Sequence, residues 1–254
     1  MRNRINTIVC FIIFLTSVSA YSQRTYPEWF IHPSQYPNLY IGYSYNGTPA
    51  VTDAERTYCV YQECIVDGEL QIYDLEAETD LLKSTDYYYN FSPDSLEKIK
   101  GRLKLVDGKM VTVFPAEYIE LFALDTIPDN FKSKSIDVLM MPRPDWIDKE
   151  FWQDYQYYYG VGEYTSTGNH NDAWKTAEER AIFKILSSLS LEVHKINIAT
   201  QSETDENMEI IRIFKVKYLL KNIQVLERYP DHLNKLFFAL VRIPIKNVVS
   251  PLMK

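Results

Sequence analysis

The chain carries one set of short motifs twice, in the same order. The first copy reads Pro-Glu-Trp-Phe from residue 27, Tyr-Ile-Gly-Tyr-Ser from residue 40 and Asp-Ala from residue 53. The second copy reads Pro-Asp-Trp-Ile from residue 144, Tyr-Gly-Val-Gly from residue 159 and Asp-Ala from residue 172. From the tryptophan to the first glycine there are 13 residues in the first copy and 14 in the second. Such an ordered set indicates an internal duplication, so we expect two similar units in tandem.

The second copy has the clearer pattern of secondary structure. An aromatic strand at 157–162 precedes a polar loop and a helix expected over about 172–189. Ala173, Ala177 and Ala181 recur every four residues, which predicts a small-residue seam that lies close against a sheet. The run 178–180, Glu-Glu-Arg, is expected on the solvated face of that helix. Strands are predicted to start at 191–194, to run from Met208 to about Arg228 and to return over 236–245.

The first copy follows the same plan with weaker signals. Its helix is predicted over 52–66 and is expected to stop at Asp67-Gly68, with strands at 69–77, 86–91, 102–106 and 110–114. Asp107-Gly108 is predicted to be a hairpin turn between the last two strands. Tyr58 and Gln62 stand where the second helix has alanines, so the tight seam is expected to be absent. Cys59 and Cys64 are expected to be buried free thiols.

Together the two copies predict an α+β fold of two tandem repeats, each a helix packed on an antiparallel sheet. The expected domains are a diverged N-terminal repeat at 21–124, a Pro- and Lys/Ser-rich connector at 125–143 and a C-terminal repeat at 144–254.

Residues 1–20 have the layout of a secretory signal peptide. Arg2 and Arg4 precede an apolar run from Ile8 to Leu15, and small residues end the segment at Ala20, the predicted cleavage site. The alternative is an uncleaved anchor helix, but the apolar run is far shorter than the ~20 residues that span a bilayer. We therefore expect an exported protein without a transmembrane helix in the mature chain. Because 34 acidic residues outnumber 27 basic ones, nucleic acid is not an expected partner.

Taken together, the Pro-acid-Trp motif, the Tyr-x-Gly-x-Gly strand, the helix with alanine every four residues and the late strand at 238–243 resemble the LPP-twenty lipoprotein family. The resemblance is best over 144–245, with a diverged copy at 27–114. It implies a small non-enzymatic protein of the bacterial cell envelope, whose units have a dodecin-like fold with a helix on a curved antiparallel sheet. Many members carry a lipid-modified cysteine at the mature N-terminus. No cysteine follows Ala20 here, so the resemblance supports export but not a lipid anchor.

No residue pattern in the sequence predicts a catalytic centre, a cofactor or a metal site. The four histidines have no metal-ligand spacing. His170 and Asp172 could form an acid–base pair, but a loop histidine beside a helix cap is the more usual meaning of that pattern. Tyrosine is the unusual residue, with 20 copies. The predicted interaction surface consists of Tyr87, Tyr88, Tyr89, Tyr155, Tyr157, Tyr158 and Tyr159, of which Tyr157 and Tyr159 should share one face of a strand.

The sequence thus predicts a non-catalytic exported protein, periplasmic or associated with the outer membrane, that binds or scaffolds other envelope components. Its expected partners are envelope proteins or a second copy of itself. The alternative is a periplasmic or surface ligand-binding module, for example for a glycan, that uses the tyrosine clusters.

Overall fold

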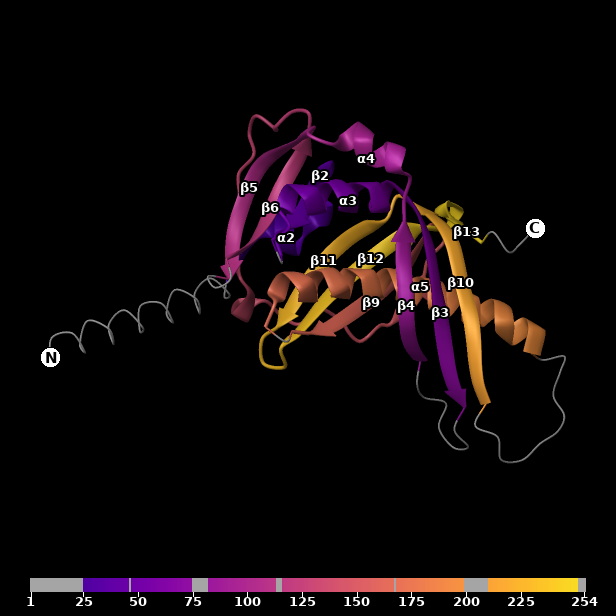
Figure 1. Cartoon of the computed structure of the whole chain (residues 1–254). Helices are drawn as coiled ribbons and strands as arrows, with labels where there is room; N and C mark the ends of the chain where they lie inside the picture. The colour runs from indigo at the N-terminus through magenta and orange to yellow at the C-terminus, as the bar shows by residue number, and fades with distance from the viewer. Residues whose placement is uncertain are drawn as a thin grey trace, which may run out of the picture.

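The computed structural model describes residues 25–45, 47–74, 82–112, 116–166, 168–198 and 210–250. Within these residues the fold is α+β, with four antiparallel sheets and few helices (Figure 1), which confirms the predicted class. No helix of the described residues is long and apolar enough to cross a membrane. The predicted signal peptide and its cleavage site at Ala20 lie outside the described residues.

The α-helices are α2 (Glu28–Ile31), α3 (Ala50–Gln62), α4 (Pro93–Ile99) and α5 (His170–Ile198). The strands are β1 (Thr25–Pro27), β2 (Leu39–Tyr43), β3 (Glu63–Asp74), β4 (Leu82–Asn90), β5 (Leu103–Thr112), β6 (Glu117–Leu124), β7 (Ser135–Asp137), β8 (Phe151–Gln153), β9 (Tyr157–Thr165), β10 (Ile210–Lys221), β11 (Gln224–Asp231), β12 (Leu236–Pro244) and β13 (Val248–Val249). Short 3₁₀ turns cover Pro33–Gln35, Val138–Met140 and Ile245–Asn247.

The sheets join segments that are far apart in the sequence. Two sheets have the orders β13-β10-β3-β4 and β11-β12-β9-β8, and the smaller ones have the orders β2-β6-β5 and β1-β7. Strand β3 pairs with β10 along its whole length, from Glu63 opposite Lys221 to Asp74 opposite Ile210. Strand β7, which lies in the predicted connector, pairs with β1. Both predicted repeats therefore contribute strands to one sheet, β13-β10-β3-β4.

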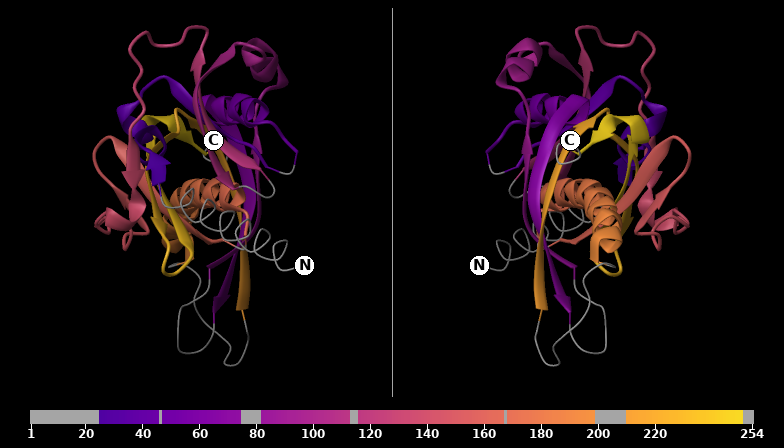
Figure 2. Two further views of the ribbon diagram at one scale, coloured as in Figure 1. Left: turned by 90° about the vertical axis from the view of Figure 1, so that its left-hand side faces the viewer. Right: turned by 90° about the vertical axis from the view of Figure 1, so that its right-hand side faces the viewer.

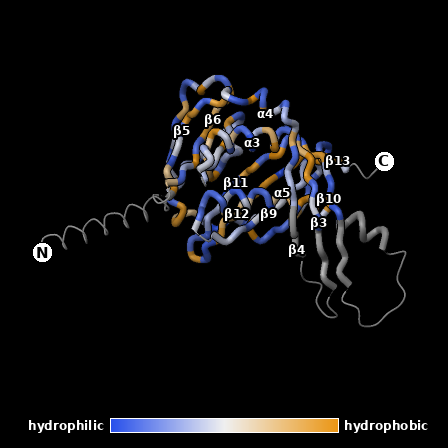
Figure 3. Tube along the Cα trace, viewed as in Figure 1, coloured by the Kyte–Doolittle hydropathy of each residue, from blue (hydrophilic) through white to orange (hydrophobic). Residues whose placement is uncertain are grey.

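Helix α5 lies between the two four-stranded sheets (Figures 1 and 2). Its Ile182, Ile185 and Leu186 belong to a core that also includes Val66 of β3 and Val241 of β12. Strand β12, which packs against α5, is among the hydrophobic parts of the chain in Figure 3. Because sheets cover α5 on two sides, polar residues near its middle cannot all reach water.

The predicted small-residue seam of α5 packs directly on β9. Ala173, Ala177 and Ala181 are fully buried. A Cβ atom added to Gly160 or Gly162 of β9 would overlap the carbonyl oxygens of Ala181 or Ala177, respectively. Glycine on the strand and alanine on the helix thus allow the two backbones to come closer than larger side chains would permit.

The first copy also has such a seam, contrary to the prediction. A Cβ atom on Gly42 of β2 would overlap the carbonyl oxygen of Ala50 and would meet the side chain of Ala54 at 2.9 Å. The prediction failed because it matched Tyr58 and Gln62 of the first helix to Ala177 and Ala181 of the second. In the structure, α3 crosses β2 one to two turns nearer its own N-terminus, where its residues are small.

A predicted helix end and a predicted hairpin turn of the first copy are wrong. Asp67-Gly68 does not stop a helix but lies inside β3, because α3 ends at Gln62 and β3 then pairs continuously with β10. Asp107-Gly108 is not a hairpin turn but lies inside β5, which is one strand with a register irregularity between Leu105 and Asp107. In both places long-range strand pairing overrides the local turn preference of an Asp-Gly pair. Cys59 and Cys64, now on α3 and β3, are buried and free as expected.

In the second copy, the strand predicted to start at 191–194 is wrong, because α5 continues to Ile198. No glycine or proline between residues 187 and 198 would end the helix. The long strand predicted to continue to Arg228 is divided into β10 and β11 at Asn222, whose φ of 57° breaks the extended backbone. Strand β12, at 236–244, confirms the predicted return strand.

Candidate functional site, a tyrosine-lined pocket between α3, β4 and α5

An ion pair between Glu178 of α5 and Arg228 of β11 lies inside the protein, with 3% and 2% of these residues exposed. Two guanidinium nitrogens of Arg228 lie 2.6 and 2.7 Å from Oε1 of Glu178, and the third donates to the carbonyl oxygen of Phe30 at 2.6 Å. The hydroxyls of Tyr43 and Tyr61 also donate to the Glu178 carboxylate. Each charged group therefore has several partners, which is the condition for tolerating a buried ion pair.

The position of Glu178 corrects the expectation that 178–180 form a solvated helix face. Arg180 is exposed, but Glu179 is partly buried and Glu178 is buried. While the seam of α5 packs on β9, Glu178 points towards β2, α3 and β11, from which Tyr43, Tyr61 and Arg228 reach it. A helix covered by other elements on several sides buries the charged residues beside its seam.

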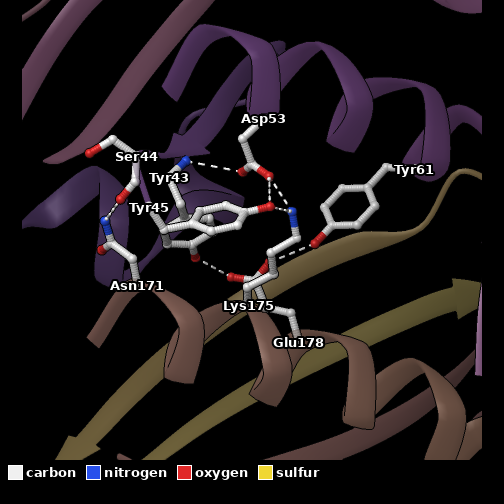
Figure 4. A network of polar contacts seen from close by, with 8 residues as sticks. All are labelled: Tyr43, Ser44, Tyr45, Asp53, Tyr61, Asn171, Lys175 and Glu178. Atoms are coloured by element: carbon white, nitrogen blue, oxygen red, sulfur yellow. Dashed lines mark hydrogen bonds and ion pairs between the residues drawn. The ribbon is translucent and has the colours of Figure 1, made fainter. Parts of the chain in front are cut away.

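A second ion pair lies one turn away, between Lys175 of α5 and Asp53 of α3 (Figure 4). Asp53 is fully buried, and its second carboxylate oxygen accepts from the backbone N–H of Tyr43 at 3.0 Å. The Lys175 ammonium also donates to the hydroxyl of Tyr45 at 3.0 Å and lies 5.0 Å from the centre of that ring. Burial lowers the pKa of Lys175, but Asp53 and Tyr45 raise it by more, so the net shift is upward and the lysine stays charged.

Asn171, at the start of α5, fixes the neighbouring backbone. Its Nδ2 donates to the carbonyl oxygens of Ser44 at 2.7 Å and of Tyr118 at 2.9 Å, at the ends of β2 and β6 (Figure 4). The cap of α5 is the side chain of Asn169, whose oxygen accepts from the backbone N–H of Asp172. With the two ion pairs, these bonds hold α3, β2 and α5 in fixed relative positions.

A pocket of about 390 Å³ opens beside this network, and we call it the α3–α5 pocket. A volume of that size accommodates a small organic ligand. Its lining consists of Tyr43, Tyr45, Arg56, Thr57, Val60, Tyr61, Tyr87, Tyr88, Tyr89, Asn90, Phe91, Lys175, Glu178, Glu179 and Ile182. The wall is thus rich in tyrosine, with charged groups from α3 and α5.

Three of the seven predicted surface tyrosines, Tyr87, Tyr88 and Tyr89 of β4, line this pocket. Tyr87 stacks on Phe183 of α5 with ring centres 4.8 Å apart. The hydroxyl of Tyr89 donates to the backbone carbonyl of Glu179 at 2.9 Å. Tyr88 is 64% exposed. Two of the three are thus partly buried against α5 and form wall, whereas Tyr88 reaches solvent.

The other four tyrosines lie in the β8–β9 region. The ring of Tyr159 stacks on Trp152 at 4.9 Å, with the planes 3° apart, and lies 6.2 Å from that of Tyr157. Lys149 lies over Trp152, and Arg242 lies over Tyr157. The row of rings therefore carries a cation at each end, which leaves little open ring face for a ligand.

Tyr158 points to the opposite face of β9, where it stacks on Phe151 and both partly buried rings pack against the core. Tyr157 and Tyr159 share the other face, as the alternation predicted. Tyr155 is 89% exposed and belongs to neither group. The structure thus divides six of the seven tyrosines between the pocket, a sheet surface and the edge of the core, and leaves Tyr155 in solvent.

His170 and Asp172 do not form a pair. Asp172 is exposed, whereas the ring of His170 packs on Phe237 at 5.1 Å. Together with His232, His170 lines a separate pocket of about 470 Å³. Burial lowers the pKa of both imidazoles. Among the described residues, no group of three or more His, Cys, Asp or Glu side chains could hold a metal ion.

Comparison with known proteins found no matching family model, no matching curated protein and no matching solved structure.

Proposed function

We propose that this chain is a non-catalytic, exported protein of the bacterial cell envelope that binds another envelope component through the α3–α5 pocket. The resemblance to the LPP-twenty lipoprotein family supports the envelope and the absence of catalysis. The pocket is the observation that carries the binding role, because buried ion pairs fix its wall and part of the predicted tyrosine surface lines it. A wall that is already ordered loses little entropy when a ligand binds.

Two tandem repeats remain part of the proposal, and the strand order supports them. In both β2-β6-β5 and β9-β12-β11, the middle strand of the three is the last in the sequence. It pairs on one side with the earliest of the three strands and on the other side with the strand directly before it in the chain. The indoles of Trp29 and Trp146 donate to Asp107 of β5 and Glu227 of β11. Each of these acids directly follows a register irregularity. In this proposal Gly42 corresponds to Gly162, rather than to Gly160. Gly42 directly follows the residue opposite Leu121 of β6, and Gly162 directly follows the residue opposite Leu240 of β12.

The first prediction concerns export. Protein recovered from the envelope fraction of the native host should begin at or within two residues of Tyr21, because Ala20 ends the charged, apolar and small-residue sequence that signal peptidases recognise. N-terminal sequencing measures this directly. A retained Met1, or recovery from the cytosol alone, would remove export from the proposal.

The second prediction concerns the binding role. Chemical cross-linking of intact envelopes, followed by mass spectrometry, should recover a defined set of envelope components with the wild-type chain. Tyr88→Ala should lose most of that set, because Tyr88 is the exposed member of the three tyrosines of β4 that line the pocket. Tyr155→Ala is the matched control, since Tyr155 is even more exposed but lies outside the pocket.

Equal recovery of envelope components with Tyr88→Ala and Tyr155→Ala would show that the pocket is not required for partner binding. Loss with Tyr155→Ala alone would transfer the role to the β8–β9 region and favour a scaffold that docks there. The α3–α5 pocket also favours the narrower candidate, a module for a small ligand such as a glycan fragment, because its volume suits one sugar-sized molecule.

A further inference from the structure

The polar groups of the α3–α5 pocket differ in how much of their hydrogen-bonding capacity is free for a ligand. The Glu178 carboxylate already accepts from Arg228, Tyr43 and Tyr61. Lys175 already donates to Asp53 and Tyr45. The hydroxyl hydrogen of Tyr89 is donated to a backbone carbonyl. These groups therefore shape the wall and contribute little further hydrogen bonding.

Glu179 is the exception. Glu179 lines the pocket and is partly buried, and no hydrogen bond or ion pair of its carboxyl group is found within the described part of the chain. Burial raises its pKa to about 7, with Lys175 opposing the shift and Glu178, Asp53 and Asp172 adding to it. A carboxyl group without a partner beside two other carboxylates is the place where an added cation gains most.

The charge balance leads to the same conclusion. The interior of the network holds three carboxyl groups, Asp53, Glu178 and Glu179, but two cations, Lys175 and Arg228. Arg56 also lines the pocket, but it is exposed, so water screens its charge. When all three carboxyl groups are ionised, the network lacks one positive charge.

We propose that the α3–α5 pocket binds a ligand that carries a primary ammonium group, placed between the Glu179 carboxylate and the tyrosine rings of the wall. The ammonium completes the charge balance, and the faces of tyrosine rings attract cations. An amino sugar and a lysine-like side chain both offer this group and are small enough for the pocket. This inference rests on the proposed binding role and specifies the chemistry of the ligand.

Calorimetry on the mature chain tests the proposal with two pairs of probes, glucosamine against glucose and Nα-acetyl-lysine amide against Nα-acetyl-norleucine amide. We expect at least one amine to bind about tenfold or more tightly than its amine-free counterpart, as one added charge interaction of about 1.4 kcal/mol would give. The pair that shows the preference identifies the source of the amine. Equal affinity within both pairs, or no binding by either amine, overturns the ammonium proposal.

The variants assign the effect to Glu179. Glu179→Gln should abolish the preference for the amine, whereas Glu163→Gln, at an exposed carboxylate of β9 outside the pocket, should preserve it. A preference that survives Glu179→Gln contradicts the assignment. Because Glu179→Gln keeps size and polarity, the variant is expected to fold, and its melting curve confirms that any loss is local.

The pH dependence gives an independent readout. The ammonium ligand should bind the ionised form of Glu179, so affinity for the lysine probe should rise about tenfold between pH 6 and pH 8. The lysine amine itself stays charged in this range. Lys175, Glu178, Asp172, Asp53, Tyr87 and Tyr89 interact electrostatically with Glu179. The other charged or titratable residues that line the pocket are Arg56, Tyr61, Tyr43 and Tyr45. Affinity that is flat over this range, or that persists in Glu179→Gln, overturns the proposal. Loss of cross-linking in Tyr88→Ala would still stand, so the two proposals fail separately.

Discussion

Glu178→Leu should lower the free energy of unfolding by about 3–5 kcal/mol, because it leaves the Arg228 guanidinium buried without its counter-ion. The hydroxyls of Tyr43 and Tyr61 lose their acceptor at the same time. Urea denaturation followed by circular dichroism measures the effect. If Glu178 faced water, as its neighbours in the sequence suggested, the same change would cost less than about 0.5 kcal/mol.

The double variant Glu178→Leu with Arg228→Leu separates a lost ion pair from a general packing defect. Removing the unpaired charge should restore at least about 1 kcal/mol relative to Glu178→Leu alone. Glu163→Leu, at an exposed position of β9, is the control for a change from a carboxylate to an apolar side chain. A double variant that is less stable than Glu178→Leu by the full cost of Arg228→Leu would show that the two residues act independently.

Gly162→Ala should destabilise the protein by about 3 kcal/mol, at the upper end of the usual cost of overpacking. Its new Cβ atom would lie far inside van der Waals contact with the carbonyl oxygen of Ala177 and the backbone of Ala181, and neither can move without displacing α5. Thermal unfolding measures the loss, which should lower the melting temperature by roughly 6–12 °C for a chain of this size.

Gly108→Ala is the matched control for Gly162→Ala. Gly108 is also a strand glycine, but its added Cβ atom would meet the Glu120 side chain at 3.4 Å, which is an ordinary contact. We expect this variant to change the stability by less than about 1 kcal/mol. Similar melting temperatures for the two variants would mean that α5 and β9 are not in close backbone contact at Gly162.

Local pattern was sufficient for those elements in which the spacing of side chains alone shows which face is buried. The aromatic strand β9, the seam of α5 and the strand β12 were predictable because alternation and the four-residue alanine spacing describe which faces are buried. Asp67-Gly68 and Asp107-Gly108 were mistaken for turns, because nothing local reveals that β10 and β6 pair with them. The short helix α4 was missed altogether.

The candidate site was predictable only in part, for the same reason. Tyr87, Tyr88 and Tyr89 were singled out by composition, and they do line a pocket. The ion pairs Glu178–Arg228 and Lys175–Asp53 join residues 50 and 122 positions apart, so no short-range spacing in the sequence predicts them. One signal was present. Ile182, Phe183, Ile185 and Leu186 occupy more than one face of α5, which is typical of a helix that is covered on several sides and buries its charges.

The pairing of β3 with β10 determines the order in which this chain can complete its fold. Glu63 pairs with Lys221, 158 residues later, and the pairing continues along the entire length of β3. A ribosome or a translocation channel releases the N-terminal residues first. Until β10 emerges, β3 exposes an unpaired edge, and α5 lacks one of the sheets that bury it. Strand β3 therefore completes its sheet only after Lys221 has been released, 158 residues after Glu63, and its edge stays exposed throughout that interval of synthesis.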